Sequence, residues 1–175
     1  MTIGQGEDAM VSTKLLSGRV KERIRFQFDF CSEFWDLKPH IQIQIDDEIT
    51  WSGLIESKKS LVEFWHELEL NASHSITLRR SNKNADQCCL LENGSLRDQY
   101  VILDRVIIDD IDIQNLVWHR GWYEPDYPEL WRQEQESKGI VLETQVIGET
   151  WFSHNGTWRF DFTSPFYKFV LNQFR

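Results

Sequence analysis

Three aspartates stand close together in the segment IIDDIDI, residues 107–113. Calcium takes six to eight oxygen ligands, and clustered carboxylates in a tight loop can supply several of them. The spacing is not that of an EF-hand loop, because no glycine or closing glutamate falls at the required positions. Aspartate also favours tight turns. The segment therefore predicts a turn, and a calcium site formed by Asp109, Asp110 and Asp112 is the alternative.

A second group of residues suited to binding lies in the segment WHRGWYEPDYPELW, residues 118–131. Trp and Tyr anchor protein contacts because they bury much area with few rotatable bonds, and Arg pairs with carboxylates across such a contact. The same rings could instead stack on sugars or fold back onto the domain. We predict a partner-binding surface composed of Trp118, Arg120, Trp122, Tyr123, Tyr127, Trp131 and Arg132.

Catalytic constellations are not recognisable in the sequence. Nucleophilic catalysis needs Ser or Cys beside His, and the five His residues are scattered. Glycoside hydrolysis needs two acids that face one cleft. Glu67, Glu69 and Asp104 instead lie along predicted strands, a pattern typical of a solvated face. We therefore expect no enzyme, no catalytic residue and no cofactor other than the alternative calcium ion.

The acidic composition argues against nucleic acid as a partner. The 175-residue chain has a formal net charge of −9 and a pI near 5.0, whereas a phosphate backbone is bound largely by clustered Lys and Arg. No apolar run approaches the ~18 residues of a membrane-spanning helix, and residues 1–14 contain no apolar signal segment. We expect neither nucleic-acid binding nor membrane binding.

Strands must position these residues, because alternating apolar and polar side chains dominate the chain. RIRFQFDF (23–30), HIQIQID (40–46) and LVEFWHELEL (61–70) each alternate in the manner of half-buried strands. QYVILDRVIID (99–109) is almost continuously apolar, which is typical of a central strand. Near the end of the chain, Asn155-Gly156 is the strongest signal for a short hairpin turn.

One helix is predicted, at the C-terminal end. Ser164 can cap it, and Pro165 suits the first helical position because its missing N–H costs nothing there. Apolar residues then recur at helical spacing over residues 166–174. Roughly seven to nine strands and one closing helix predict an all-β fold, an antiparallel β-sandwich of jelly-roll type with one short C-terminal helix.

Two parts are expected along the chain. Residues 1–18 are polar and without periodicity, and they predict a flexible or partner-ordered N-terminal arm. Residues 19–175 are expected to form the sandwich domain. Its longest irregular segment, which contains Pro125 and Pro128, predicts an aromatic-rich loop at about residues 115–139.

Three blocks of the sequence resemble, in order and spacing, small proteins of T-even-like cyanophages and related marine tailed phages. They are HELELNASHSITLRR (66–80), DRVIIDDIDI (104–113) and HNGTWRFDFTSPFYKFVL (154–171), and the resemblance covers about residues 60–171. That group has an apolar or aromatic residue where His154 stands here. Its sandwich is similar to the calcium-dependent xylan-binding modules, which are carbohydrate-binding modules.

The resemblance implies a non-enzymatic structural or accessory protein of a tailed-bacteriophage particle. Such a virion protein lies in the host cytoplasm during assembly and docks on other virion subunits, and self-association is a further expectation. The alternative function is a carbohydrate-binding module that recognises a host glycan, with calcium near Asp109, Asp110 and Asp112. The aromatic segment could serve either function.

Overall fold

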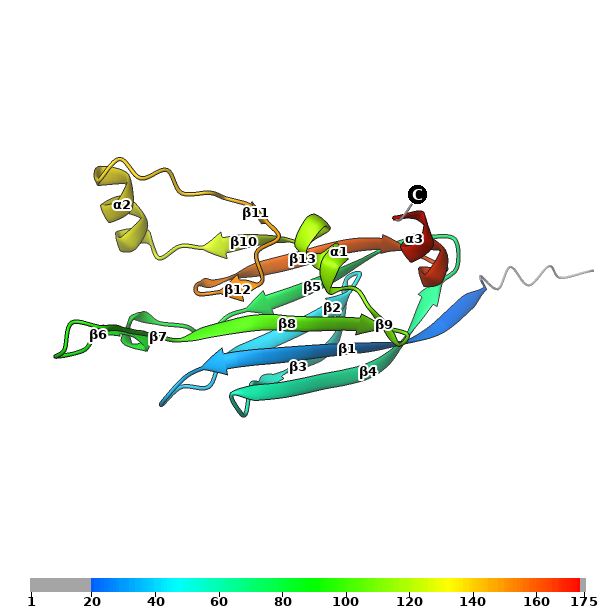
Figure 1. Ribbon diagram of the computed structural model, residues 1–175, viewed down its shortest axis with the longest axis horizontal. Coiled ribbons are helices and arrows are strands. Elements are labelled where there is room, and N and C mark those ends of the chain that lie inside the picture. Colours follow the sequence, from blue (N-terminus) through cyan, green and yellow to red (C-terminus); the bar gives the residue numbers. More distant parts are fainter. Residues whose placement is uncertain (1–19, 174–175) are drawn as a thin grey trace, which may run out of the picture.

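Alternating sequences form two antiparallel sheets in the computed structural model, which describes residues 20–173 (Figure 1). Sheet A follows the order β12-β8-β1-β4, with β9 paired to β8, and sheet B follows the order β11-β10-β13-β5-β2-β3. The strands of sheet A are β1 (Lys21–Glu33), β4 (Lys59–Glu69), β8 (Tyr100–Ile108), β9 (Ile111–Asp112) and β12 (Trp151–Phe152). Those of sheet B are β2 (His40–Ile45), β3 (Glu48–Leu54), β5 (Ser73–Arg80), β10 (Trp122–Asp126), β11 (Val146–Ile147) and β13 (Asn155–Thr163).

The core lies between the sheets and is filled by every second residue of their strands. In β1, Phe26, Phe28 and Phe30 are at most 1% exposed, and Trp158 and Phe160 of β13 are fully buried. Alternation therefore predicts the inward face correctly, because successive side chains of a strand point to opposite sides of the sheet. The predicted antiparallel β-sandwich is confirmed, and so is the prediction of a strand at residues 61–70.

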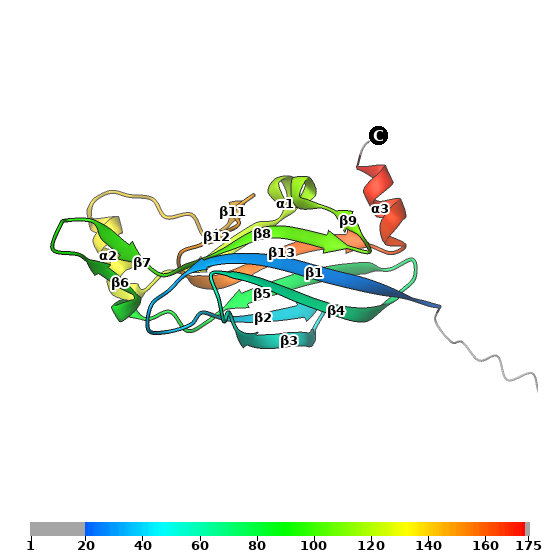
Figure 2. The same ribbon diagram turned by 60° about the horizontal axis from the view of Figure 1, so that its bottom comes forward.

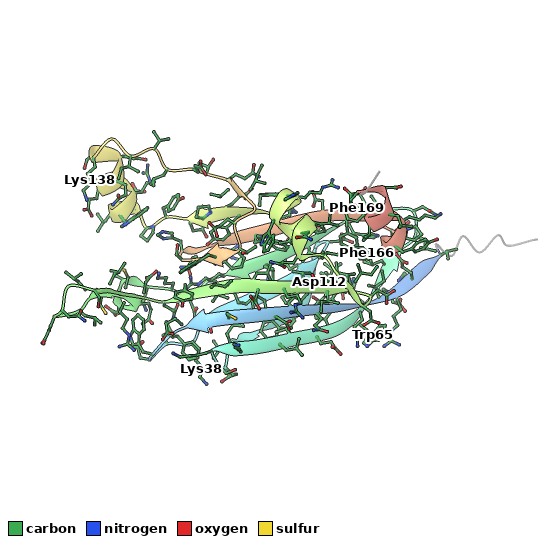
Figure 3. The ribbon with its side chains drawn as sticks, viewed as in Figure 1. Lys38, Trp65, Asp112, Lys138, Phe166 and Phe169 are labelled. Atoms are coloured by element: carbon green, nitrogen blue, oxygen red, sulfur yellow. The ribbon has the colours of Figure 1, made fainter. Side chains whose placement is uncertain are left out.

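Two helices close the sandwich. Helix α1 (Gln114–Arg120) contacts β8 of sheet A together with β11 and β13 of sheet B. Helix α3 (Phe166–Asn172) is the predicted C-terminal helix, and its Phe166 and Phe169 pack on Phe162 of β13 (Figure 3). Ser164 does not cap α3, because its hydroxyl donates to the carboxylate of Glu22 instead.

Regular structure replaces most of the aromatic-rich loop predicted at residues 115–139. The segment contains α1, β10 and helix α2 (Glu129–Ser137). β10 is a strand because it pairs with β13 and β11. Helix α2 carries Glu–Arg pairs at i,i+3 and i,i+4 spacing, which stabilise a helix on its own surface. The prediction of an irregular loop was therefore wrong.

The hairpin predicted at Asn155-Gly156 was also wrong, because both residues belong to β13. The strand before them, β12, pairs with β8 in sheet A, so the chain changes sheets between β12 and β13. The only two-stranded ladder outside the sandwich, within residues 20–173, is the hairpin of β6 (Cys88–Leu90) and β7 (Leu96–Asp98), which follows a 3₁₀ turn at Ala85–Gln87.

The hairpin β6–β7 and helix α2 project from the same end of the sandwich, and α3 lies at the opposite end (Figures 1 and 2). The predicted N-terminal arm, residues 1–18, lies outside the described residues. Among the helices of residues 20–173, none is both long and apolar enough to cross a membrane.

Candidate functional site

A cleft of about 710 Å³ lies where the hairpin β6–β7 leaves sheet A, and we call it the Trp151 cleft. Two aromatic side chains form its centre. Trp151 of β12 faces Ile102 in the sheet register, so Tyr100, two residues earlier on β8, lies on the same outer face. The two ring centroids are 4.8 Å apart and the ring planes are tilted by 51°. Trp151 is 51% exposed, so its ring is accessible from solvent.

Three carboxylates surround these rings, and each is held by a neighbour. Glu33 at the end of β1 accepts from Lys58 at 2.9 and 3.1 Å. Asp98 at the end of β7 accepts from Lys83 at 2.5 Å. Glu149 accepts from the backbone N–H of Trp151 at 2.6 Å. Since a carboxylate has about four acceptor positions, fixed carboxylates of this kind can still receive hydroxyl donors.

The hairpin β6–β7 supplies the outer wall of the cleft. Leu91 and Leu96 are 39% and 65% exposed, and they add apolar surface beside Trp151. Arg97 lies in the same wall, and its guanidinium carbon is 4.2 Å from the ring centroid of Trp35, in cation–π geometry. The cleft therefore combines accessible rings, acceptors and a fixed donor.

A buried guanidinium ties together the strands that carry the two rings. Arg80, at the end of β5 in sheet B, is 1% exposed. Its Nη1 donates to the carbonyl of Phe152, which follows Trp151, and its Nη2 donates to Oε1 of Gln99 at 2.7 Å, just before Tyr100. Desolvation by burial lowers the pKa of Arg80 to about 10. From the interior of the protein, Arg80 therefore holds in place the backbone next to Trp151 and Tyr100.

The network continues through Gln99, which is fully buried. Its Nε2 donates to the carbonyl of Leu37 at 2.6 Å and to Oε1 of Gln87 at 3.2 Å. Its backbone N–H donates to the carbonyl of Gln87 at 2.9 Å. A chain of side-chain amides thus joins the start of β8 to the segments before β2 and before β6.

The predicted partner-binding residues do not form one surface. Tyr123 is 3% exposed and belongs to the core, where its hydroxyl lies 2.6 Å from the carbonyl oxygen of His154. Burial raises the pKa of the Tyr123 phenol well above its usual range. Trp122 is half-buried and donates from Nε1 to Glu124 at 3.2 Å. Tyr123 is therefore a structural residue, contrary to the expectation that it contacts a partner.

Tyr127 and Trp131 pack against His154 rather than facing outward as a pair. The rings of Tyr127 and Trp131 stack at 5.3 Å between centroids, and the His154 ring lies 5.0 and 4.9 Å from them. This contact fixes the start of α2 on the turn before β13. Of the three possibilities raised by the sequence, which were a protein contact, stacking on sugars and folding back onto the domain, the last describes these rings.

The remaining predicted contact residues lie on helices. Trp118 of α1 is 51% exposed. Arg120, at the end of α1, donates to Gln173, and its guanidinium lies 5.3 Å from the centroid of the Phe169 ring. Arg132 pairs with Glu129 and with Glu136, both at 2.7 Å, on its own helix α2. Of the seven predicted residues, Trp118 is therefore the one that offers a large apolar surface to a partner.

The acidic turn links β8 to β9, as predicted. Asp109 and Asp110 adopt left-handed backbone angles, with φ of 49° and 64°. Asp110 forms an ion pair with Arg25, and Asp112 accepts from the backbone N–H of Gln114 at 2.9 Å. Within residues 20–173, no three His, Cys, Asp or Glu side chains are grouped so that they could hold a metal. Because calcium also takes backbone carbonyls and waters as ligands, the calcium site at Asp109, Asp110 and Asp112 stays a prediction.

Acidification is expected to destabilise the contact at His154. Burial, followed by the charge of Lys83, lowers the pKa of His154 below its ordinary 6.5. Between pH 6.5 and the lower pKa of the folded state, the unfolded chain binds more protons than the folded protein. The stability present above pH 6.5 is therefore lost as the pH falls through this range. We expect the melting temperature to fall less between pH 7.5 and 5.0 in His154→Phe than in the parent protein. An equal fall in melting temperature in the two proteins would contradict this prediction.

Sequence reasoning missed the Trp151 cleft. Its residues come from three separate segments, at position 33, positions 91–100 and positions 149–153, and the sequence pattern places Tyr100 only in a central strand. One signal was available, because Trp151 and Tyr100 are large aromatics flanked by the acids Glu149 and Asp98. Their proximity depends on the pairing of β8 with β12, which local patterns do not encode.

Comparisons with known proteins show a likeness in fold only. No protein-family model matches the chain, and no curated protein matches it. A solved structure titled "vCBM60 in complex with galactobiose" is similar, with a TM-score of 0.45 and 8% sequence identity. The match covers 78% of this chain and 96% of that one. The phage resemblance seen in the sequence stays a prediction.

Proposed function

We propose that this protein is a non-catalytic module that binds neutral glycan chains in the Trp151 cleft. The observation that carries the proposal is the accessible Trp151–Tyr100 pair surrounded by fixed carboxylates. One face of a pyranose ring presents C–H groups, which gain by leaving water against an aromatic face. Its hydroxyls can donate to Glu33, Asp98 and Glu149. The volume of about 710 Å³ lies within the usual range for ligand sites, roughly 300–1,000 Å³.

The ring geometry favours a soluble chain over a flat crystalline surface. A planar polysaccharide surface would need coplanar rings, whereas Trp151 and Tyr100 are tilted by 51°. A sugar stacked on Trp151 would meet Tyr100 at its edge. The two rings therefore suit one or two sugar units enclosed on two sides.

The charges of the cleft favour neutral sugars. Among the residues that line it, Glu33, Asp98 and Glu149 outnumber the cation Arg97, in a chain of formal net charge −9. Uronic acids or sulfate esters would bring like charges close to these carboxylates, which costs free energy. Neutral hexoses and pentoses meet no such penalty.

Trp151→Ala is expected to weaken binding to the best neutral oligosaccharide by at least about tenfold, because the stacking surface is removed. A glycan array identifies the oligosaccharide, and titration calorimetry measures the loss. Trp118→Ala is the matched control, since Trp118 is equally 51% exposed but lies on α1. Equal losses in the two variants, preferential binding of acidic glycans, or no binding to any neutral glycan would refute the proposal.

A second candidate function is docking on other subunits of a tailed-phage particle, as the sequence resemblance implies. The observation that favours it is the exposure of large apolar side chains on the α1–β11 side and on α2. Trp118 is 51% exposed, Ile147 is 69% exposed and Leu130 is 83% exposed. Docking predicts that Trp118→Ala blocks incorporation into particles while glycan binding persists, which separates the two functions.

A further inference from the structure

Strand β4 forms a long outer edge of sheet A. All eleven of its residues pair with β1, from Lys21↔Glu69 to Cys31↔Lys59, without a register shift. Among the strands of residues 20–173, none pairs with the other side of β4. A regular exposed edge of this kind can add a strand from another chain.

The other sheet edges are shorter or irregular. β12 and β11, which end the two sheets on the opposite side, have two residues each. β3, the remaining edge of sheet B, pairs with β2 through a register shift between Ile43 and Gln44. Short strands and bulges are two of the usual protections against edge pairing, and β4 has neither. It does carry a third protection, charged side chains, which include Lys59, Glu63 and Glu67.

The hydrogen bonds at both ends of β4 show which of its residues direct their backbone N–H and C=O groups away from β1. The N–H of Leu70 donates to the carbonyl of Val20 at 2.9 Å, and the N–H of Ser32 donates to the carbonyl of Lys58 at 2.9 Å. Bonded and non-bonded pairs alternate along an antiparallel ladder. Even-numbered residues of β4 therefore direct their backbone groups to β1. Odd-numbered residues, from Lys59 to Glu69, direct theirs outward. At the two ends, the carbonyl oxygen of Lys59 already accepts from the Ser57 hydroxyl at 2.5 Å, and that of Glu69 lies 2.9 Å from Nε2 of His74.

We propose that β4 pairs antiparallel with β4 of a second copy of this chain, about a twofold axis at Glu63. In this register the outward-bonding residues face one another, with Leu61 opposite Trp65 and Lys59 opposite Glu67. Leu61 and Trp65 are 58% and 52% exposed, and Figure 3 shows Trp65 at this border of the sheet. The pairing covers both apolar side chains and brings opposite charges together twice.

Charge complementarity favours a second copy as the occupant. Lys59 lies at one end of β4 and Glu67 towards the other, so antiparallel self-pairing matches them. In the monomer Glu67 contacts the exposed Lys21 at 3.4 Å and is itself largely exposed, so a second cation can approach it. Glu63 opposes its own copy, and this like-charge contact keeps the association weak. The dimer is therefore expected to depend on concentration.

Two substitutions at one position test the pairing in opposite directions. Glu63→Gln removes the like-charge contact, so we expect the dimer to tighten by about two- to fivefold. Glu63→Pro removes an outward N–H without removing a hydrogen bond to β1, so we expect the dimer to be lost while the fold persists. Sedimentation velocity over a wide concentration range measures the dissociation constant, and circular dichroism verifies folding.

A charge exchange gives an independent test that does not alter the backbone. Lys59→Glu is expected to weaken the dimer by about tenfold, because it places like charges together at two symmetric positions. Adding Glu67→Lys is expected to restore the affinity. Lys168→Glu, an exposed residue of α3, makes the same charge change away from β4 and is expected to leave the dimer unchanged. The proposal would be overturned if the chain stays monomeric or if Glu63→Pro leaves the dimer unaffected. It would also be overturned if Glu67→Lys does not restore the dimer affinity lost in Lys59→Glu.

Discussion

Arg80→Met is expected to lower the free energy of unfolding by about 3–5 kcal/mol, because it leaves several buried groups without partners. The guanidinium donates to the carbonyl of Phe152 and to both oxygens of Gln99, at 3.2 and 2.7 Å. These acceptors stay buried when the donor is removed. For a chain of this length the loss corresponds to a melting temperature lower by about 10 °C.

The control is the neighbouring residue. Arg79 lies on the same strand with its side chain on the exposed face, so Arg79→Met is expected to change stability by no more than about 0.5 kcal/mol. Arg80→Lys keeps the charge but loses the planar fork, and we expect an intermediate loss. Urea unfolding of the three variants measures these differences. Equal stability of the Arg80→Met and Arg79→Met variants would mean that the buried network does not contribute to the free energy of unfolding.

The same variant tests the link between the interior and the cleft. Arg80 holds Phe152 and Gln99, the neighbours of Trp151 and Tyr100. Any glycan binding should therefore weaken in Arg80→Met at temperatures where the protein is still folded.

Strand positions could be predicted from the sequence because one face of each strand is buried. Ile76 and Leu78 of β5 are at most 1% exposed, and Arg80 follows at the next inward position. The alternation places Arg80 inside the protein. Its partners could not be predicted, because Phe152 and Gln99 reach it only through the packing of sheet A against sheet B.

The candidate site could not be predicted for a related reason. The aromatic residues that are adjacent in sequence, such as Trp122 and Tyr123, point to opposite sides of β10, so only one of them is accessible. The rings that form the cleft are separated by about fifty positions and meet because β12 pairs with β8. The density of aromatic residues along the chain therefore did not indicate these two rings.

Helix α2 was missed although its sequence carried a signal. Glu129, Arg132 and Glu136 stand at i, i+3 and i+7, a spacing that places them on one helix face. The prolines before this segment favoured a loop. Pro128 instead directly precedes the helix, where a missing N–H costs nothing.

At Asn155-Gly156 the sequence signal identifies a position that requires glycine, but the reason for the glycine is not a hairpin turn. The pair is typical of a two-residue hairpin turn, in which glycine is needed for its backbone freedom. Here glycine is needed because β10 approaches closely. A Cβ atom on Gly156 would lie 2.5 Å from the carbonyl oxygen of Glu124 and 2.7 Å from the hydroxyl of Tyr123.

Gly156→Ala is therefore expected to destabilise the fold by about 2–4 kcal/mol, because a backbone carbonyl and a buried phenol must both move. Gly139→Ala is the control for backbone strain alone. Gly139 has a φ of 77°, and a Cβ atom added to it would meet no atom of the described residues within 4 Å, so we expect a loss of about 1 kcal/mol. Tyr123→Phe removes the hydroxyl from the contact, so the double variant should lose less than the sum of the single variants. Urea unfolding of the four variants measures the coupling. If Gly156→Ala and Gly139→Ala lose equal stability, or if the losses of Gly156→Ala and Tyr123→Phe are additive, the close approach of β10 is not the reason for glycine at position 156.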